Sequence, residues 1–155
     1  MPLEVNLQQL VTGAADAIMV CDAGGAIVLW NKACERIFGF TEAETLGQSM
    51  DMIIPMRQRA RHWEGYHKTM ATAITKYGAD LLRVPALHKD GHTLSIAFTV
   101  SMLFGDDGKV SSIAAIVRDE SARFADDRKM RARVSELEAL VAASASSAAG
   151  KASGG

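Results

Sequence analysis

The stretch from residue 81 to residue 118 constrains the fold of this chain most, because strand-like runs alternate there with tight-turn sequences. The predicted strands and turns, in order, are 81–88, Asp90-Gly91, 93–104, Asp106-Asp107-Gly108 and 109–118. In the middle run, large apolar side chains such as Phe98 and Val100 alternate with smaller or polar ones such as Thr99. This alternation is typical of a strand with one buried face. We therefore expect three antiparallel strands joined by short connections.

A second pair of strands and a helical middle precede this stretch. Residues 17–30 are predicted to form a hairpin, because two short apolar runs flank the turn sequence Asp22-Ala23-Gly24-Gly25. The predicted helices are 32–38 after the capping residue Asn31, a single turn at 41–44, and 56–74 after Pro55. The order predicts an α+β fold, with a five-stranded antiparallel sheet and helices gathered on one face.

Three flanking segments are predicted outside the domain of residues 14–120. Residues 1–13 form an N-terminal helical cap, in which leucines recur near helical spacing. Residues 121–142 form a charged C-terminal helix, and residues 143–155, which contain only Ala, Ser, Gly and Lys, form a disordered tail.

The C-terminal helix carries an apolar stripe. Its members, at alternating spacings of four and three, are Met130, Val134, Leu137 and Val141. This is the seam of a coiled coil two heptads long, and a helix of this length needs a partner for its apolar side. We expect a parallel homodimer, while a helix folded back on its own domain is the alternative.

Composition excludes several classes of protein. The chain has 155 residues, of which 48% are hydrophobic, as in one globular domain. The net charge of -1 argues against nucleic-acid binding, and no run of about 18 apolar residues could span a membrane. No signal peptide is apparent, so we expect a cytoplasmic protein in which Cys21 and Cys34 are reduced, buried thiols. Hydrolase, zinc-protease and P-loop motifs are absent, so we do not expect an enzyme.

Positive charge is concentrated in one segment. Residues 55–78 carry five basic side chains and one acidic one, whereas residues 1–54 carry two basic and seven acidic ones. His62 and His67 lie in the same basic segment. Such a segment could be a solvated helix face, or it could hold an anionic ligand.

An ordered set of short motifs resembles the PAS sensor family over residues 14–120. The motifs are Asp16-Ala17-Ile18, Trp30-Asn31-Lys32-Ala33, residues 38–47, Ile53-Ile54-Pro55, His88-Lys89-Asp90-Gly91 and Val117-Arg118-Asp119-Glu120. The resemblance implies a ligand-binding cleft between the sheet and the helices. It also implies that a signal leaves through a flanking helix to an output partner.

Residues 54–62 resemble the haem-binding helix of rhizobial and enterobacterial oxygen-sensing PAS proteins. The resemblance implies that haem b binds with its iron on His62, while Lys68 and Lys76 lie near the propionates. Tyr66 falls one residue later than the tyrosine of those sensors, and Trp63 is inserted. The implied signal is a diatomic gas (O2, CO or NO) or the redox state.

The rest of the implied site is an apolar wall. Its expected members are Met70, Leu82, Ile96, Phe98, Val100, Ile113 and Ile116. Leu82 occupies the position at which the rhizobial sensors carry an arginine that meets oxygen, and Arg83 follows it. A distal pocket without a hydrogen-bond donor favours CO over O2, unless Arg83 is aimed inward.

Several alternatives stay open at this point. His62 could be a surface histidine; His67 lies about 140° away on the helix, so the two cannot share one iron. The flavin-adduct chemistry of LOV domains is excluded, because no cysteine lies in the required segment. Non-covalent FAD, stacked on Trp30 or Trp63, is the alternative cofactor. The domain could also be an interaction module that binds an apolar metabolite or no ligand.

Overall fold

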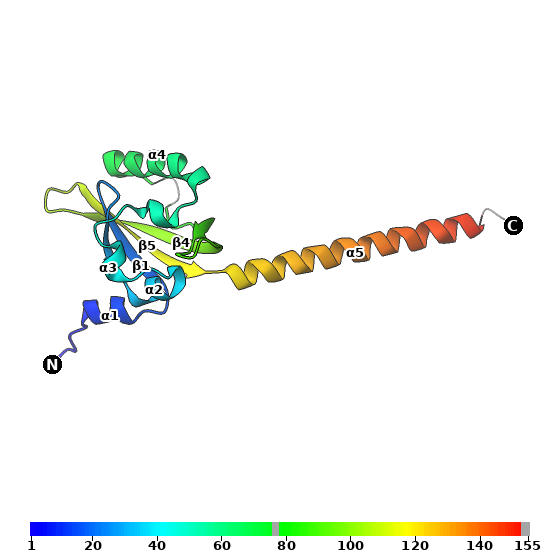
Figure 1. Cartoon of the computed structure of the whole chain (residues 1–155), viewed down its shortest axis with the longest axis horizontal. Coiled ribbons are helices and arrows are strands. Elements are labelled where there is room, and N and C mark those ends of the chain that lie inside the picture. The colour runs from blue at the N-terminus through cyan, green and yellow to red at the C-terminus, as the bar shows by residue number, and fades with distance from the viewer. Residues whose placement is uncertain (76–77, 153–155) are drawn as a thin grey trace. The chain divides into compact units, whose positions relative to one another are not determined.

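The computed structural model describes residues 1–75 and 78–152 and contains one five-stranded sheet (Figure 1). The strands are β1 (Ala17–Asp22), β2 (Ile27–Trp30), β3 (Leu82–Leu87), β4 (Thr93–Phe104) and β5 (Val110–Asp119). Their order across the sheet is β2-β1-β5-β4-β3, and every neighbouring pair is antiparallel. The predicted α+β fold is thereby confirmed.

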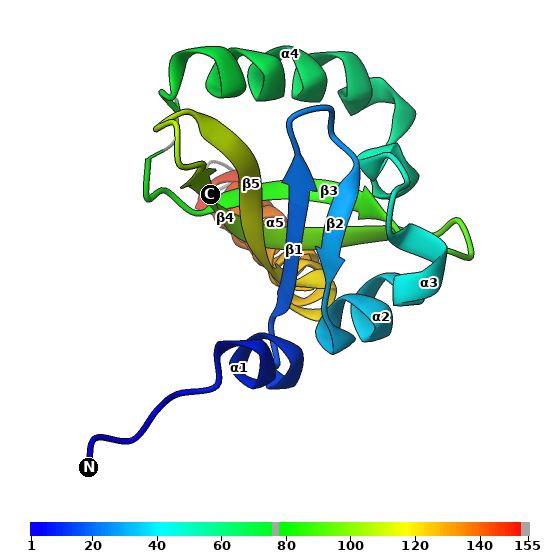
Figure 2. The same ribbon diagram turned by 90° about the vertical axis from the view of Figure 1, so that its left-hand side faces the viewer.

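Helices lie before the β1–β2 hairpin and between this hairpin and the last three strands. The elements are α1 (Leu7–Gly13), α2 (Lys32–Phe38), α3 (Glu42–Thr45), the 3-10 helix η1 (Met50–Ile53) and α4 (Met56–Thr72). In Figure 2, α4 crosses beyond the β1–β2 turn, while α1 and α2 lie toward the other end of β1. Helix α1 begins at Leu7, within the helical cap predicted over residues 1–13, because the side chain of Asn6 caps it by accepting a hydrogen bond from the Gln9 N–H.

Capping side chains fix the helix boundaries as the sequence predicts. Asn31 Oδ1 accepts the main-chain N–H of Cys34, and Thr41 forms a reciprocal capping box with Glu44. Helix α4 ends at Thr72 rather than at residue 74, because Ala73 adopts a left-handed conformation with a φ of 56°.

The register of the strands defines two faces of the sheet. Residues directly across an antiparallel pair share a face, and neighbours along a strand alternate between faces. The inner face carries the side chains that pack in the core with the helices: Ala17, Met19, Cys21, Leu94, Ile96 and Val117. Leu94 and Ile96 are buried, whereas Phe104 at the far end of β4 is exposed.

Residues 121–155 form a second compact unit. Helix α5 (Ser121–Ala152) continues well past the expected end at residue 142. Residues 143–152 are therefore helical, whereas we had expected them to be disordered. Alanine has the highest intrinsic helix propensity, and the alanine-rich segment therefore extends the helix. No helix within the described ranges is long and apolar enough for a membrane crossing.

Candidate ligand-binding site

Helix α4 is held at its N-terminal end by Arg59. The guanidinium donates to the carbonyls of Ile54 (3.0 Å) and Asp51 (3.1 Å), which belong to the segment that enters the helix. The Asp51 carbonyl also accepts the Ile54 main-chain N–H (3.1 Å), so Arg59 adds a second hydrogen bond at the end of η1. The helix that carries His62 is therefore fixed relative to η1.

Two aromatic residues fix α4 to the β1–β2 hairpin. Trp63 donates its indole N–H to Asp51 Oδ1 (2.7 Å), and its ring packs over Gly25. Tyr66 is buried, and its hydroxyl reaches the carbonyls of Cys21 (3.1 Å) and Asp22 (2.5 Å). Burial raises the pKa of Tyr66 above its ordinary value, so the phenol stays a hydrogen-bond donor. Because that hydroxyl is occupied, only the ring of Tyr66 is left to contact a ligand.

His62 lies on the same side of α4, between the core and solvent. Its ring centroid is 4.6 Å from that of Trp63 and 5.8 Å from that of Tyr66. Burial lowers the pKa of His62, which favours the neutral imidazole. Its Nδ1 atom is buried and has no hydrogen-bond partner among the described residues. A buried polar atom without a partner is rare and indicates a missing ligand or water.

Gln58 is a candidate that the sequence did not single out. Its Oε1 atom is also buried without a partner among the described residues, and Gln58 precedes His62 by four residues. Side chains at this spacing lie next to each other on one helix face. The spacing was visible in the sequence, but an exposed helix face of Gln and Arg gives the same pattern.

Five expected wall residues share the inner face of the sheet, namely Leu82, Ile96, Phe98, Val100 and Ile113. Leu82 lies directly across from Phe98, and Ile96 follows on the same face of β4. Ile113 lies further along β5, four residues from Val117, which is the partner of Phe98. This corresponds to about 13 Å along the strand axis. The structure therefore places Leu82, Ile96 and Phe98 together, and Ile113 nearer the end of the sheet that Tyr66 covers.

Two expected site residues lie on the opposite face, contrary to our expectation. Arg83 is across from Ala97, and its Nε donates to Glu120 Oε2 (3.1 Å). Ile116 is across from Thr99 and is 47% exposed. Alternation along the strand is the reason, since neighbours of inner-face residues must point outward. Neither residue contributes to the inner face.

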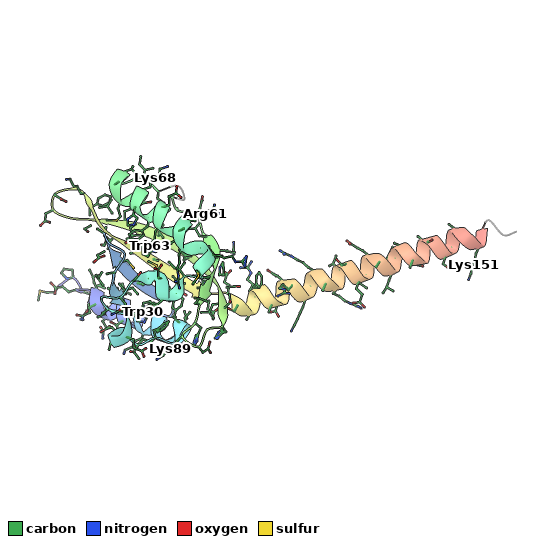
Figure 3. All side chains as sticks on the ribbon, turned by 45° about the horizontal axis from the view of Figure 1, so that its top comes forward. Trp30, Arg61, Trp63, Lys68, Lys89 and Lys151 are labelled. Atoms are coloured by element: carbon green, nitrogen blue, oxygen red, sulfur yellow. The ribbon has the colours of Figure 1, made fainter. Side chains whose placement is uncertain are left out.

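The remaining expected residues divide by exposure. Lys68 and Arg61 are exposed on α4, whereas Trp63 packs against the core (Figure 3). Met70 also packs against the core. Lys76 lies outside the described residues. The positive charge on α4 is thus available at the surface of the helix.

The rival candidates are placed as follows. His67 is exposed, as expected, and stacks on Trp63 at a centroid distance of 6.0 Å. Trp30 is 2% exposed, and its indole N–H donates to the Phe40 carbonyl, so its ring is a core element that cannot stack on a flavin. Cys21 and Cys34 are buried, as expected.

Comparison with known proteins identifies the family. A family model described as PAS domain matches residues 15–122. An uncharacterised protein of Azorhizobium caulinodans is 33% identical over 128 residues, which cover 82% of this chain and 17% of that protein. "Sensor protein FixL" of Bradyrhizobium diazoefficiens is 29% identical over 150 residues, which cover 96% of this chain and 28% of that protein. "Oxygen sensor protein DosP" of Escherichia coli K12 is 25% identical over 134 residues, which cover 86% of this chain and 16% of that protein. The chain thus spans less than a third of the length of these relatives.

Solved structures match the fold. The PAS domain of a protein from Colwellia psychrerythraea superimposes with a TM-score of 0.66 at 23% identity, covering 75% of this chain and 95% of that one. An RNA-binding light-oxygen-voltage receptor gives a TM-score of 0.63 at 22% identity, covering 86% and 37%. At these identities the likeness shows the fold alone.

Proposed function

The chain belongs to the PAS domain family, and we propose that this sensory domain binds haem b through His62 and responds to a diatomic gas or to redox state. The observation that carries the proposal is the imidazole of His62, which is partly buried, neutral and left with a partnerless Nδ1. A neutral imidazole is the usual proximal ligand of haem iron.

The residues proposed to surround a haem on His62 suit a flat, apolar and anionic group. Tyr66 and Met70 follow His62 on α4, while Leu82, Ile96 and Phe98 line the inner face of the sheet. Lys68 and Arg61 supply exposed positive charge for the propionates. Haem in such a site would supply reversible binding of a diatomic gas and a one-electron redox couple.

Two of the relatives are named as sensors, one of them for oxygen, which supports the same function here. For the whole protein, we propose that the domain signals through its C-terminal helix to an output partner. The relatives extend far beyond the matched region, which supports an output in a partner protein or in a further domain.

Titration of the protein with haemin, followed by absorbance at the Soret band, tests the proposal. We expect saturation at one haem per chain. His62→Ala removes the only protein bond to the iron in this proposal, so haem retention on a desalting column should be lost or strongly reduced. His67→Ala is the matched control, since it removes an exposed imidazole from the same helix.

Three outcomes contradict the assignment. An unchanged Soret spectrum in His62→Ala means that another residue binds the iron. A flavin absorbance band in the purified protein supports the FAD alternative. A colourless protein that does not take up haemin is an interaction module, which binds an apolar metabolite or no ligand.

A further inference from the structure

The turn between β3 and β4 brings two histidines together, far along the chain from the proposed haem ligand. His88 follows β3 and His92 precedes β4. The turn is closed by main-chain bonds from the His88 N–H to the His92 carbonyl and from the Gly91 N–H to the His88 carbonyl, both 2.9 Å. Gly91 provides the positive φ of 95° that this turn requires. The two imidazoles consequently stack, with centroids 4.4 Å apart and planes inclined by 20°.

A carboxylate completes the cluster. Asp90 Oδ1 lies 3.2 Å from His88 Nδ1 and is in hydrogen-bond contact with His92 Nδ1. The ligating atoms of His88, Asp90 and His92 all lie within 4.8 Å of one another.

The spacing of the His88 and Asp90 ligand atoms suits metal ligation, whereas His92 Nδ1 would have to exchange its contact with Asp90 Oδ1 for a bond to the metal ion. In a tetrahedral zinc site with bonds of about 2.0–2.1 Å, neighbouring ligand atoms are about 3.3 Å apart. The separation of 3.2 Å between His88 Nδ1 and Asp90 Oδ1 is close to this value. His88 Nδ1 accepts the Asp90 N–H (3.1 Å), and a metal ion on this nitrogen would replace that hydrogen bond, because the ring nitrogen has one lone pair. A neutral imidazole with such a lone pair is the form that binds metals.

The turn is held against the body of the domain. The Lys89 N–H donates to the Phe38 carbonyl (2.9 Å), and Lys89 Nζ pairs with Glu44 Oε1 (2.5 Å). The ring of His88 packs over Gly39, where an added Cβ would lie 2.6 Å from Cε1. His88 therefore has little freedom to lose when a ligand binds, which favours binding.

We propose that His88, Asp90 and His92 form a surface site for a divalent transition-metal ion of the zinc class. Two imidazoles and one carboxylate supply three ligands, and water completes the coordination. The plainer reading is a polar turn in which Asp90 only accepts hydrogen bonds from His92. The two readings differ in whether the cluster binds zinc.

Isothermal titration of the full chain with zinc chloride, in a non-chelating buffer near neutral pH, separates them. We expect one zinc ion per chain. His92→Ala and Asp90→Asn should each lower the affinity by about tenfold or more, since even partners of metal ligands contribute that much. His67→Ala is the matched control, because it removes an exposed histidine that lies outside the turn. The zinc affinity of this variant should equal that of the wild-type protein. His62→Ala should also keep the zinc affinity.

The proposal is overturned if wild-type protein shows no saturable zinc binding, or if the affinity is unchanged in His92→Ala. It is equally overturned if His62→Ala abolishes the binding, because zinc would then occupy α4. Circular dichroism of each variant establishes that the chain is folded. His92 is 53% exposed at its side chain, so its replacement leaves the core intact. None of these results depends on whether haem binds at His62.

Discussion

The indole ring of Trp63 lies directly over Gly25, so closely that a Cβ atom at Gly25 would come within 2.3 Å of the ring. This contact joins the turn between β1 and β2 to the helix that carries His62. Gly25 has a φ of 86°, a conformation that side chains with a Cβ atom rarely adopt.

Gly25→Ala should therefore destabilise the domain on two grounds. The left-handed backbone and the displacement of Trp63 together should lower the free energy of unfolding by about 2 kcal/mol or more. Urea denaturation monitored by Trp fluorescence measures the change. Gly24→Ala is the matched control, because an added Cβ there meets only Asp22 Oδ1 at 3.6 Å, and its midpoint should stay close to wild type. Equal midpoints for both variants would contradict the role of the Trp63 contact.

Asn31 stabilises the domain more than an ordinary helix cap does. Its Oδ1 accepts the N–H groups of Ile18 (3.0 Å) and Cys34 (3.1 Å), and its Nδ2 donates to the Val11 and Asp16 carbonyls. Asn31→Ala leaves these groups without partners, so we expect a loss of about 2–4 kcal/mol in unfolding free energy.

Asn6 provides the comparison for this experiment. It caps α1 but is exposed, so Asn6→Ala should lower the free energy of unfolding by about 1 kcal/mol or less. Chemical denaturation of the two variants side by side checks the difference. A loss for Asn31→Ala no larger than that for Asn6→Ala would mean that the buried hydrogen bonds contribute little.

The two thiols should be inert in the folded protein. Burial raises the pKa of Cys21 and of Cys34 from 9.0 to about 12. The thiolate fraction near neutral pH is then roughly a thousandfold below that of an ordinary thiol. Ellman's reagent should titrate two thiols only after unfolding; rapid labelling of native protein would contradict the burial.

The same shift predicts how stability depends on alkaline pH. A raised pKa means that the folded protein holds a proton which the unfolded chain releases first. The contribution of each thiol is therefore fully present below pH 9.0 and is lost progressively as the pH rises toward about 12. Unfolding midpoints across this range should decline less steeply in Cys34→Ala than in wild type.

Gas preference follows from which side of the sheet each residue occupies, if haem binds as proposed. Leu82 is on the inner face and offers no hydrogen-bond donor, while Arg83 pairs with Glu120 on the outer face. O2 gains more than CO from a distal donor, so the ferrous protein should favour CO and autoxidise readily. Leu82→Arg should slow autoxidation, whereas Arg83→Ala should leave it unchanged. Autoxidation accelerated by Arg83→Ala would assign gas contact to Arg83.

The apolar stripe on α5 predicts self-association. Val134 and Leu137, two members of this stripe, are 49% and 44% exposed. Leu137→Asp would place a desolvated carboxylate on the seam and weaken a dimer by at least about tenfold. Sedimentation equilibrium measures the change. Ser135→Asp, about 200° away on the helix, is the control and should leave the dimer intact. A wild-type chain that stays monomeric at high micromolar concentration would rule the dimer out.

Local patterns in the sequence determined most of the fold. These patterns are short, because each involves residues that are close together in the chain. Examples are the alternating apolar residues around Phe98, the Asp-Gly turns and the caps at Asn31 and Thr41. The motif around His62 likewise indicated the helix on which a ligand would sit. The alanine-rich tail was misjudged, because its composition suits both a disordered linker and a helix.

Tertiary structure decided which side chains share a site. Register places Leu82 inward and Arg83 outward, and a shift by one residue would exchange them, which no local pattern reveals. The burial of Trp30 and the packing of Trp63 over Gly25 depend on contacts between distant segments. Sequence spacing determines which residues can share a turn or a helix face. Only the packing of the whole chain determines whether that face points into the core or toward solvent.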